Sequence, residues 1–249
     1  MTRKEHEKGP FLPGIHHYLA GMRSNSLGLM RPPSLALLML GALLIASLQS
    51  WTAGAEAPLR LLAFGDSLVH GYGLAGGETF PEQLEAALRN RGLPVEVLNG
   101  GNAGGTPAAG LARLDWALAD RPDAVLVELG ANDGLRGIDP NSTYENLDAI
   151  LTRLGAEGLP VLLAGMLAPR NLGSDYAGAF DAVFPALAEK HGVVFYPFFL
   201  EGVAVQPALN QADGIHPNAA GVAVIVERIL PKVLVLIDGL PQVAGGGDG

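Results

Sequence analysis

The stretch LRLLAFGDSLVHGYGL, residues 59–74, contains an apolar run that ends at a Gly-Asp-Ser turn. Four further runs rich in Val, Leu and Phe follow, so that the five runs lie near residues 60–64, 95–98, 124–129, 161–166 and 193–198. Short apolar runs bounded by turn residues are typical of buried strands. The sequence therefore predicts five strands, and Ser67 directly follows the first.

Segments with helical spacing separate the runs. Leucine and isoleucine residues between 147 and 154 repeat at i, i+3, i+4 and i+7, and Ser142 with Glu145 fits a capping box before them. The spacing recurs at Phe80, Leu84, Ala87 and Leu88, and at Phe180, Val183, Phe184 and Leu187. A last helix is predicted from Ala219 to Ile237, bent or broken at Pro231. Trp116 is expected in the core.

Strands that alternate with helices predict an α/β fold, in which right-handed crossovers build a five-stranded parallel sheet with helices on both faces. No internal repeat or second globular domain is evident. Ligands of such sheets bind beyond the carboxyl ends of the strands. The loops that follow the five runs are therefore the places to look for chemistry.

Residues 1–55 have the layout of a signal peptide or N-terminal anchor. An uncharged apolar run follows Arg31, namely SLALLMLGALLIASLQSW at residues 34–51. The small-x-small pattern of a signal-peptide cleavage site occurs after it, at 53–55 and at 55–57. The apolar run is near the lower length limit for a membrane span, so cleavage and retention as an anchor are both open. Met22 and Met30 each offer an internal start, and a start at Met30 would leave residues 1–29 untranslated. We expect the folded domain at 56–240, a disordered tail at 241–249 and a periplasmic or secreted protein, membrane-anchored if uncleaved.

The composition excludes several classes of protein. The chain of 249 residues is 49% hydrophobic and carries a net charge of −9, which argues against a nucleic-acid partner because such partners select basic surfaces. The absence of cysteine excludes disulfides, thiolate metal sites and a cysteine nucleophile. Nothing in the sequence requires more than a monomer.

Four loops at the expected strand ends contain polar residues. They are GDSL with Ser67, NGGNAGGTPAAG at 99–110, VELGANDGLRG at 127–137 with Asn132, and ADGIHPN at 212–218 with Asp213 and His216. An aspartate three residues before a histidine can bond one ring nitrogen and leave the other as a base. Acyl transfer needs a nucleophile, donors for the oxyanion, a base and a group that orients the base. The four loops offer these as a serine, a backbone amide with a side-chain amide, and an Asp–His pair.

Each loop also has an ordinary explanation. Asp and Ser are favoured helix N-caps, Asn132 and Asp133 fit an Asx-turn, and the histidine loop fits a surface turn. The glycines at 100–105 nearly fit a phosphate loop, but Thr106 stands where its lysine should be. A metal site of Asp66, Asp133, Asp213 and His216 would contain a single histidine, and we expect no metal and no cofactor.

The ordered blocks GDSL, N…G, GAND and DGIHPN resemble those of the SGNH, or GDSL, hydrolase family, over about residues 60–237. GLARL (110–114), APRNLGSDYAGAF (168–180) and YPFFLEGVA (196–204) are similar to its bacterial periplasmic thioesterase I, arylesterase and lysophospholipase group. The chain departs from the family at Ala131, where glycine is usual. Its glycine pairs at 100–101 and 104–105 leave Gly104 and Gly105 as alternative amide donors, and alignment on Asn99 and Thr106 favours Gly104.

The resemblance implies a flavodoxin-like three-layer α/β/α sandwich. It also implies that Ser67 is the nucleophile, His216 the base and Asp213 its orienter, with an oxyanion hole of Ser67, Gly104 and Asn132. The implied substrates are carboxylic esters and thioesters, namely aryl esters, acyl-CoA and lysophospholipids. We expect the loop after the fourth strand to contact the acyl chain through Leu167, Ala168, Pro169, Asn171 and Leu172. Two alternatives stay open: a carbohydrate O-deacetylase of the same fold, and a non-catalytic binding protein.

Overall fold

The computed structural model describes residues 57–240. These residues all belong to one compact unit of the chain. The predictions for residues 1–55 and 241–249 therefore lie outside the described residues.

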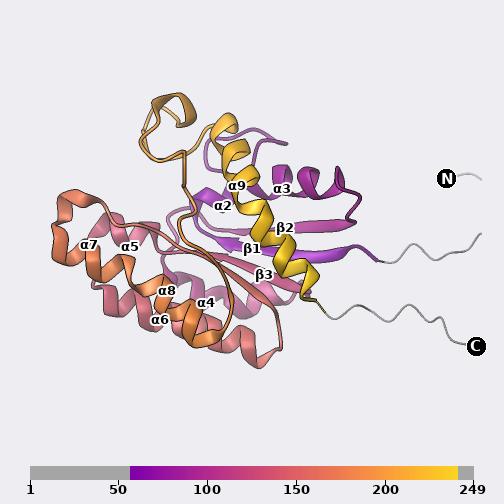
Figure 1. Ribbon diagram of the computed structural model, residues 1–249, viewed down its shortest axis with the longest axis horizontal. Helices are drawn as coiled ribbons and strands as arrows, with labels where there is room; N and C mark the ends of the chain where they lie inside the picture. The colour runs from indigo at the N-terminus through magenta and orange to yellow at the C-terminus, as the bar shows by residue number, and fades with distance from the viewer. Residues whose placement is uncertain (1–56, 241–249) are drawn as a thin grey trace, which may run out of the picture. The chain divides into compact units, whose positions relative to one another are not determined.

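Five parallel strands form one sheet in the order β2-β1-β3-β4-β5 (Figure 1). The strands are β1 (Leu59–Gly65), β2 (Val95–Gly101), β3 (Ala124–Glu128), β4 (Val161–Ala164) and β5 (Val194–Tyr196). This order is that of flavodoxin-like sheets, in which the direction of strand addition reverses beside β1. Gly65 at the end of β1 pairs in register with Gly101 of β2 and Glu128 of β3. The carboxyl ends of these three strands therefore lie level with one another.

Helices cover both faces of the sheet. The helices are α2 (Ser67–His70), α3 (Phe80–Arg89), α4 (Pro107–Leu118), α5 (Ala131–Arg136), α6 (Pro140–Ala156), α7 (Ser174–Asp181), α8 (Val183–His191) and α9 (Ala219–Asp238), with 3₁₀ turns η1 (Arg170–Leu172) and η2 (Pro207–Leu209). Figure 1 shows α3 and α9 over one face, and α4, α6 and α8 over the other. The predicted α/β fold with a five-stranded parallel sheet is confirmed.

The helix faces predicted from spacing form the core. Leu147, Ile150, Leu151 and Leu154 of α6 are all buried, and so are the phenylalanines at 80, 180 and 184. Every residue of β3 is buried, as expected for a central strand covered by helices on both faces. Within residues 57–240 no helix combines the length and hydropathy that a membrane span needs.

Several helices differ in detail from the sequence predictions. Trp116 is 78% exposed, because α4 buries the face that carries Gly110, Leu114 and Ala117 instead. Helix α6 begins earlier than the Ser142–Glu145 pair, at Pro140. Its N-cap is Asp139, whose side chain accepts a hydrogen bond from the Asn141 N–H at 3.0 Å.

The last helix continues through Pro231, and residues on both sides of the proline are buried against the sheet. Proline removes one hydrogen bond from a helix interior. Here the carbonyl that loses its partner belongs to Glu227, whose residue is exposed to solvent. Of the two predicted alternatives, a break at Pro231 is therefore wrong, and a bend there stays a prediction. The helix predicted around Phe180 to Leu187 is in turn divided at Ala182 into α7 and α8.

Candidate active site

Ser67 is the first residue of the short helix α2, directly beyond the carboxyl end of β1. Asp66 caps this helix: its side-chain oxygen Oδ1 accepts a hydrogen bond from the Leu68 N–H at 3.0 Å. Gly71 ends the helix in the left-handed conformation. The cap that offered an ordinary explanation for Gly-Asp-Ser is thus present, and it is formed by Asp66 and not by Ser67.

A glycine at the end of β2 lets α2 lie close to the sheet. A Cβ atom at Gly101 would stand 2.1 Å from the backbone nitrogen of His70, well inside van der Waals contact. Any other residue at this position would push the end of α2 away. The glycine therefore helps to set where Ser67 sits.

The structure brings the predicted serine, histidine and aspartate together. His216 Nε2 lies 3.0 Å from Ser67 Oγ, and His216 Nδ1 lies 2.7 Å from Asp213 Oδ2. Because an ionised aspartate only accepts, the ring nitrogen facing Asp213 carries the proton. Nε2 is then free to accept the proton of the Ser67 hydroxyl.

Asp213 also builds the turn that carries the histidine. Its Oδ1 accepts the N–H groups of Ile215 at 2.9 Å and His216 at 3.0 Å. The His216 N–H, the His216 ring and the Ile215 N–H together lower the pKa of Asp213 to about 2. Asp213 is therefore ionised throughout the neutral range.

Two residues that the sequence analysis did not single out hold the histidine turn against α2. The Tyr72 ring packs against the His216 ring at 4.7 Å between centroids. The Gln211 side-chain amide donates to the Tyr72 carbonyl at 2.7 Å and to the Pro217 carbonyl at 3.0 Å. No sequence pattern identifies these contacts, because Tyr72 and Gln211 are 139 residues apart.

The two candidate glycines in the loop after β2 differ in whether their N–H group is already used. The Gly105 N–H donates to the Asn102 carbonyl at 2.9 Å. Within residues 57–240 the N–H groups of Gly104 and Ser67 have no hydrogen-bond partner. Gly104 has a φ of +73°, a conformation that glycine adopts without strain. Of the two candidate glycines, Gly104 is thus the one whose N–H is available to a ligand.

The Asn132 side chain lies in a network that defines which way its amide points. Its nitrogen Nδ2 donates to Asp66 Oδ2 and to the Gly105 carbonyl, each at 3.0 Å, and its oxygen accepts from Arg136 at 3.2 Å. Two acceptors on one side and a donor on the other leave a single consistent amide orientation. The Asn132 amide nitrogen therefore faces the end of β1 and the glycine loop.

Asp66, Asp133 and Asp213, which an alternative prediction grouped as metal ligands, have separate partners. Asp213 bonds His216, Asp66 caps α2, and Asp133 accepts from the Thr143 hydroxyl at 2.8 Å. In the described part of the chain no three His, Asp or Glu side chains are grouped as metal ligands would be.

The loop after β4 presents two apolar side chains to solvent. Leu167 is 41% exposed and Leu172 is 38% exposed, and Asn171 is exposed beside them. Pro169 is half-buried. Ala168 instead is 4% exposed and donates its N–H to Asp181 Oδ1 at 2.9 Å, so it supports the loop from within.

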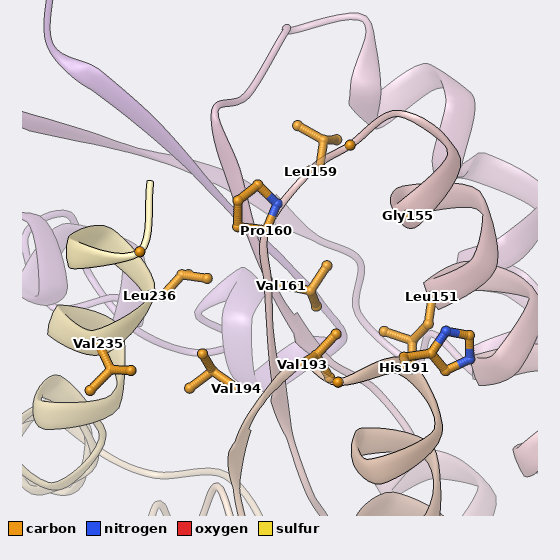
Figure 2. Close-up of a pocket in the computed structure, with 13 residues that line it drawn as sticks. Leu151, Gly155, Leu159, Pro160, Val161, His191, Val193, Val194, Val235 and Leu236 are labelled. Carbon is orange, nitrogen blue, oxygen red and sulfur yellow. The ribbon is translucent and has the colours of Figure 1, made fainter. Parts of the chain in front are cut away.

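A separate pocket of about 390 Å³ lies at the opposite edge of the sheet (Figure 2). Val161 and Val194 line it at the amino ends of β4 and β5, together with Val235 and Leu236 of α9. Its one titratable side chain, His191, bonds Asp148 Oδ1 at 2.6 Å. None of the predicted site residues lines this pocket.

Comparison with known proteins places the chain in a family. Residues 63–224 match the model of the GDSL-like Lipase/Acylhydrolase family. The chain is 38% identical to the Esterase TesA of Pseudomonas aeruginosa over 203 residues, 81% of this chain and 99% of that protein. It is 37% identical to the Thioesterase 1/protease 1/lysophospholipase L1 of Escherichia coli strain K12 over 188 residues, 75% of this chain and 89% of that protein.

A solved structure gives the same result. The crystal structure of AlinE4, an SGNH-hydrolase family esterase, superposes with a TM-score of 0.63 at 43% identity, covering 76% of this chain and 100% of that one. The resemblance of the four sequence blocks to this family is thus confirmed. The chain belongs to the GDSL-like lipase/acylhydrolase family, and it is a GDSL-type esterase/thioesterase hydrolase.

Proposed function

We propose that this protein hydrolyses carboxylic esters and thioesters through an acyl-enzyme on Ser67. The observation that carries the proposal is the chain of hydrogen bonds from Asp213 through His216 to Ser67 Oγ, at 2.7 and 3.0 Å. In this arrangement Ser67 is the nucleophile, and the unprotonated nitrogen of His216 can accept its proton. The Asp213 carboxylate orients the His216 ring and stabilises the charge that the ring gains.

In the proposed first step His216 Nε2 takes the hydroxyl proton as Ser67 Oγ bonds to the substrate carbonyl carbon. The carbonyl electron pair moves to its oxygen. The bond to the alcohol or thiol then breaks, and the leaving group takes the proton from His216. Water, activated in the same way, attacks the acyl-Ser67 ester and releases the acid.

The oxyanion in this mechanism is bound by three donors: the Ser67 N–H, the Gly104 N–H and the Asn132 side-chain amide. The two backbone N–H groups are unpaired within residues 57–240. Asn132 uses one hydrogen for Asp66 and the other for the Gly105 carbonyl. We infer that the oxyanion displaces the Gly105 carbonyl, because the bond to ionised Asp66 is the stronger of the two.

The proposed substrates are aryl esters, acyl-CoA thioesters and lysophospholipids. Exposed Leu167 and Leu172 would contact the acyl chain, with Asn171 and half-buried Pro169 beside them. Ala168 has a supporting position in the loop. The signal-like segment at 34–51 supports export from the cytoplasm, which N-terminal sequencing of the protein recovered from the periplasm would test.

The test is hydrolysis of a p-nitrophenyl acyl ester series by the full chain, with Ser67→Ala and Ser142→Ala. Ser142 is exposed on α6 and serves as the matched control. We expect Ser67→Ala to lose several orders of magnitude in kcat and Ser142→Ala to keep it. If the wild type is folded but inactive on every chain length, the esterase proposal fails. Release of acetate from acetylated polysaccharide would then favour the deacetylase.

A further inference from the structure

A fully buried glutamate contacts Asp66, the residue that precedes the proposed nucleophile. Glu128 ends β3, a strand whose other residues are all hydrophobic, and its exposed fraction is 0%. Among residues 57–240 no lysine, arginine or histidine forms an ion pair with it. An isolated buried carboxylate is costly, so its neighbours must explain its presence.

The nearest titratable neighbour is a second buried carboxyl group, Asp66, which is also 0% exposed. Glu128 Oε2 accepts the Asp66 N–H at 3.2 Å, and Gly65, the residue before Asp66, pairs in register with Glu128. Two buried carboxyl groups this close cannot both stay ionised, because like charges that share a site out of water repel each other. The pair therefore holds one proton.

Hydrogen bonding decides which group holds that proton. Both Asp66 oxygens accept N–H donors, from Leu68 and from Asn132, as a carboxylate requires. Glu128 Oε1 is buried and has no donor. Burial and the charge of Asp66 raise the pKa of Glu128 well above its usual range. Burial also raises the pKa of Asp66, to about 6, against the N–H groups that lower it.

The nearby cation acts on Asp66 and leaves Glu128 without a partner. Arg113 of α4 donates to the Gly65 and Gly100 carbonyls at 2.7 and 2.8 Å and lies 4.1 Å from the centre of the Phe64 ring. The charges of Arg113 and Asp66 attract each other. Arg113 therefore favours a negative Asp66 and a proton on Glu128.

We propose that Glu128 is a positioning residue: as a neutral acid it donates to the Asp66 carboxylate and thereby fixes Asp66 in contact with Asn132 and with the start of α2. Asp66 bonds the Asn132 amide at one oxygen and caps the helix that begins with Ser67 at the other. The effect of Glu128 on turnover rests on the proposed function. Its effect on the Asn132 side chain does not.

Two variants test the proposal in the full chain. Glu128→Gln keeps the shape together with one donor and one acceptor, and thus imitates the neutral acid. Glu128→Met has a similar length and offers no donor. We expect kcat within about threefold of wild type for Glu128→Gln, and a loss of about tenfold or more with little change in KM for Glu128→Met, the effect of losing one buried hydrogen bond.

A second readout does not depend on activity. The NMR signal of the Asn132 side-chain amide should keep its position in Glu128→Gln and shift in Glu128→Met. If Glu128→Met does not fold, the Asn132 signal and kcat are still compared between the wild type and Glu128→Gln. The infrared spectrum adds a further measurement, because at pH 7 only the wild type should show the band of a protonated carboxylic acid.

Three results would overturn the proposal: an unshifted Asn132 signal in folded Glu128→Met, a Glu128→Gln variant as impaired as Glu128→Met, or no acid band in the wild type. A wild type that shows the acid band and the Asn132 response but cleaves no ester would instead refute the proposed function. The two failures are therefore distinguishable.

Discussion

The protonated Glu128 makes the stability of this protein depend on pH in a specific direction. The pKa of Glu128 is raised above its ordinary value of 4.5 because the side chain is buried beside Asp66. Above that pH the unfolded chain has lost a proton that the folded protein keeps. Stability therefore falls as pH rises, by about 1.4 kcal/mol per pH unit for as long as the folded protein holds the proton.

Glu128→Gln has no such proton to lose. Asp66 titrates in both proteins, so that its effect cancels in their difference. The free energy of unfolding of the variant minus that of the wild type should thus increase by about 3 kcal/mol between pH 5 and pH 7. The assay is urea unfolding of both proteins at several pH values in this range. The curves are fitted with one shared m value, the dependence of the free energy of unfolding on urea concentration.

The matched control is Glu227→Gln, which removes a carboxyl group at an exposed position of α9. The difference in free energy of unfolding between this variant and the wild type should stay constant over the same pH range. Parallel stability curves for Glu128→Gln and the wild type would show that the folded protein holds no extra proton on Glu128, and the assignment of the buried pair would have to be abandoned.

Two further predictions concern Asn132 and Gly101. Asn132→Ala removes one proposed oxyanion donor and should lower kcat by about 100- to 1000-fold with little change in KM, whereas an unchanged kcat would remove Asn132 from the mechanism. Gly101→Ala places a Cβ atom 2.1 Å from the His70 nitrogen, and should destabilise the protein by about 1–3 kcal/mol in urea unfolding and lower kcat by moving α2. Gly76→Ala is its control, because a Cβ atom there meets nothing within 4 Å; equal stability of the two variants would contradict the argument.

The errors of the sequence predictions have a common origin. The sequence analysis expects Trp116 in the core, but on α4 it lies off the face defined by Leu114 and Ala117. The pair Ser142 and Glu145 matched a helix start, although Asp139 lies only three residues before Ser142 and forms the cap. A local pattern shows that a helix or turn is favoured, and several nearby residues can satisfy the same pattern.

Local sequence patterns were enough to predict the five strands, the buried faces of several helices and the four loops that carry Ser67, Gly104, Asn132 and His216. This was possible because strand and helix periods are local, and because a parallel sheet brings every strand's carboxyl end to one edge. The Asp213–His216 pair was also readable, since the two residues lie within a single turn.

The contacts that hold these residues in place could not be predicted from local patterns. Glu128 is, in the sequence, only the charged end of an apolar strand, and its contact with Asp66 spans 62 residues and depends on the register of β1 against β3. Alignment had favoured Gly104 over Gly105, and the folded loop adds the physical reason, because the Gly105 N–H already donates to the Asn102 carbonyl. Such contacts join residues that no local spacing relates, because they exist only once the sheet has set which strand ends are neighbours.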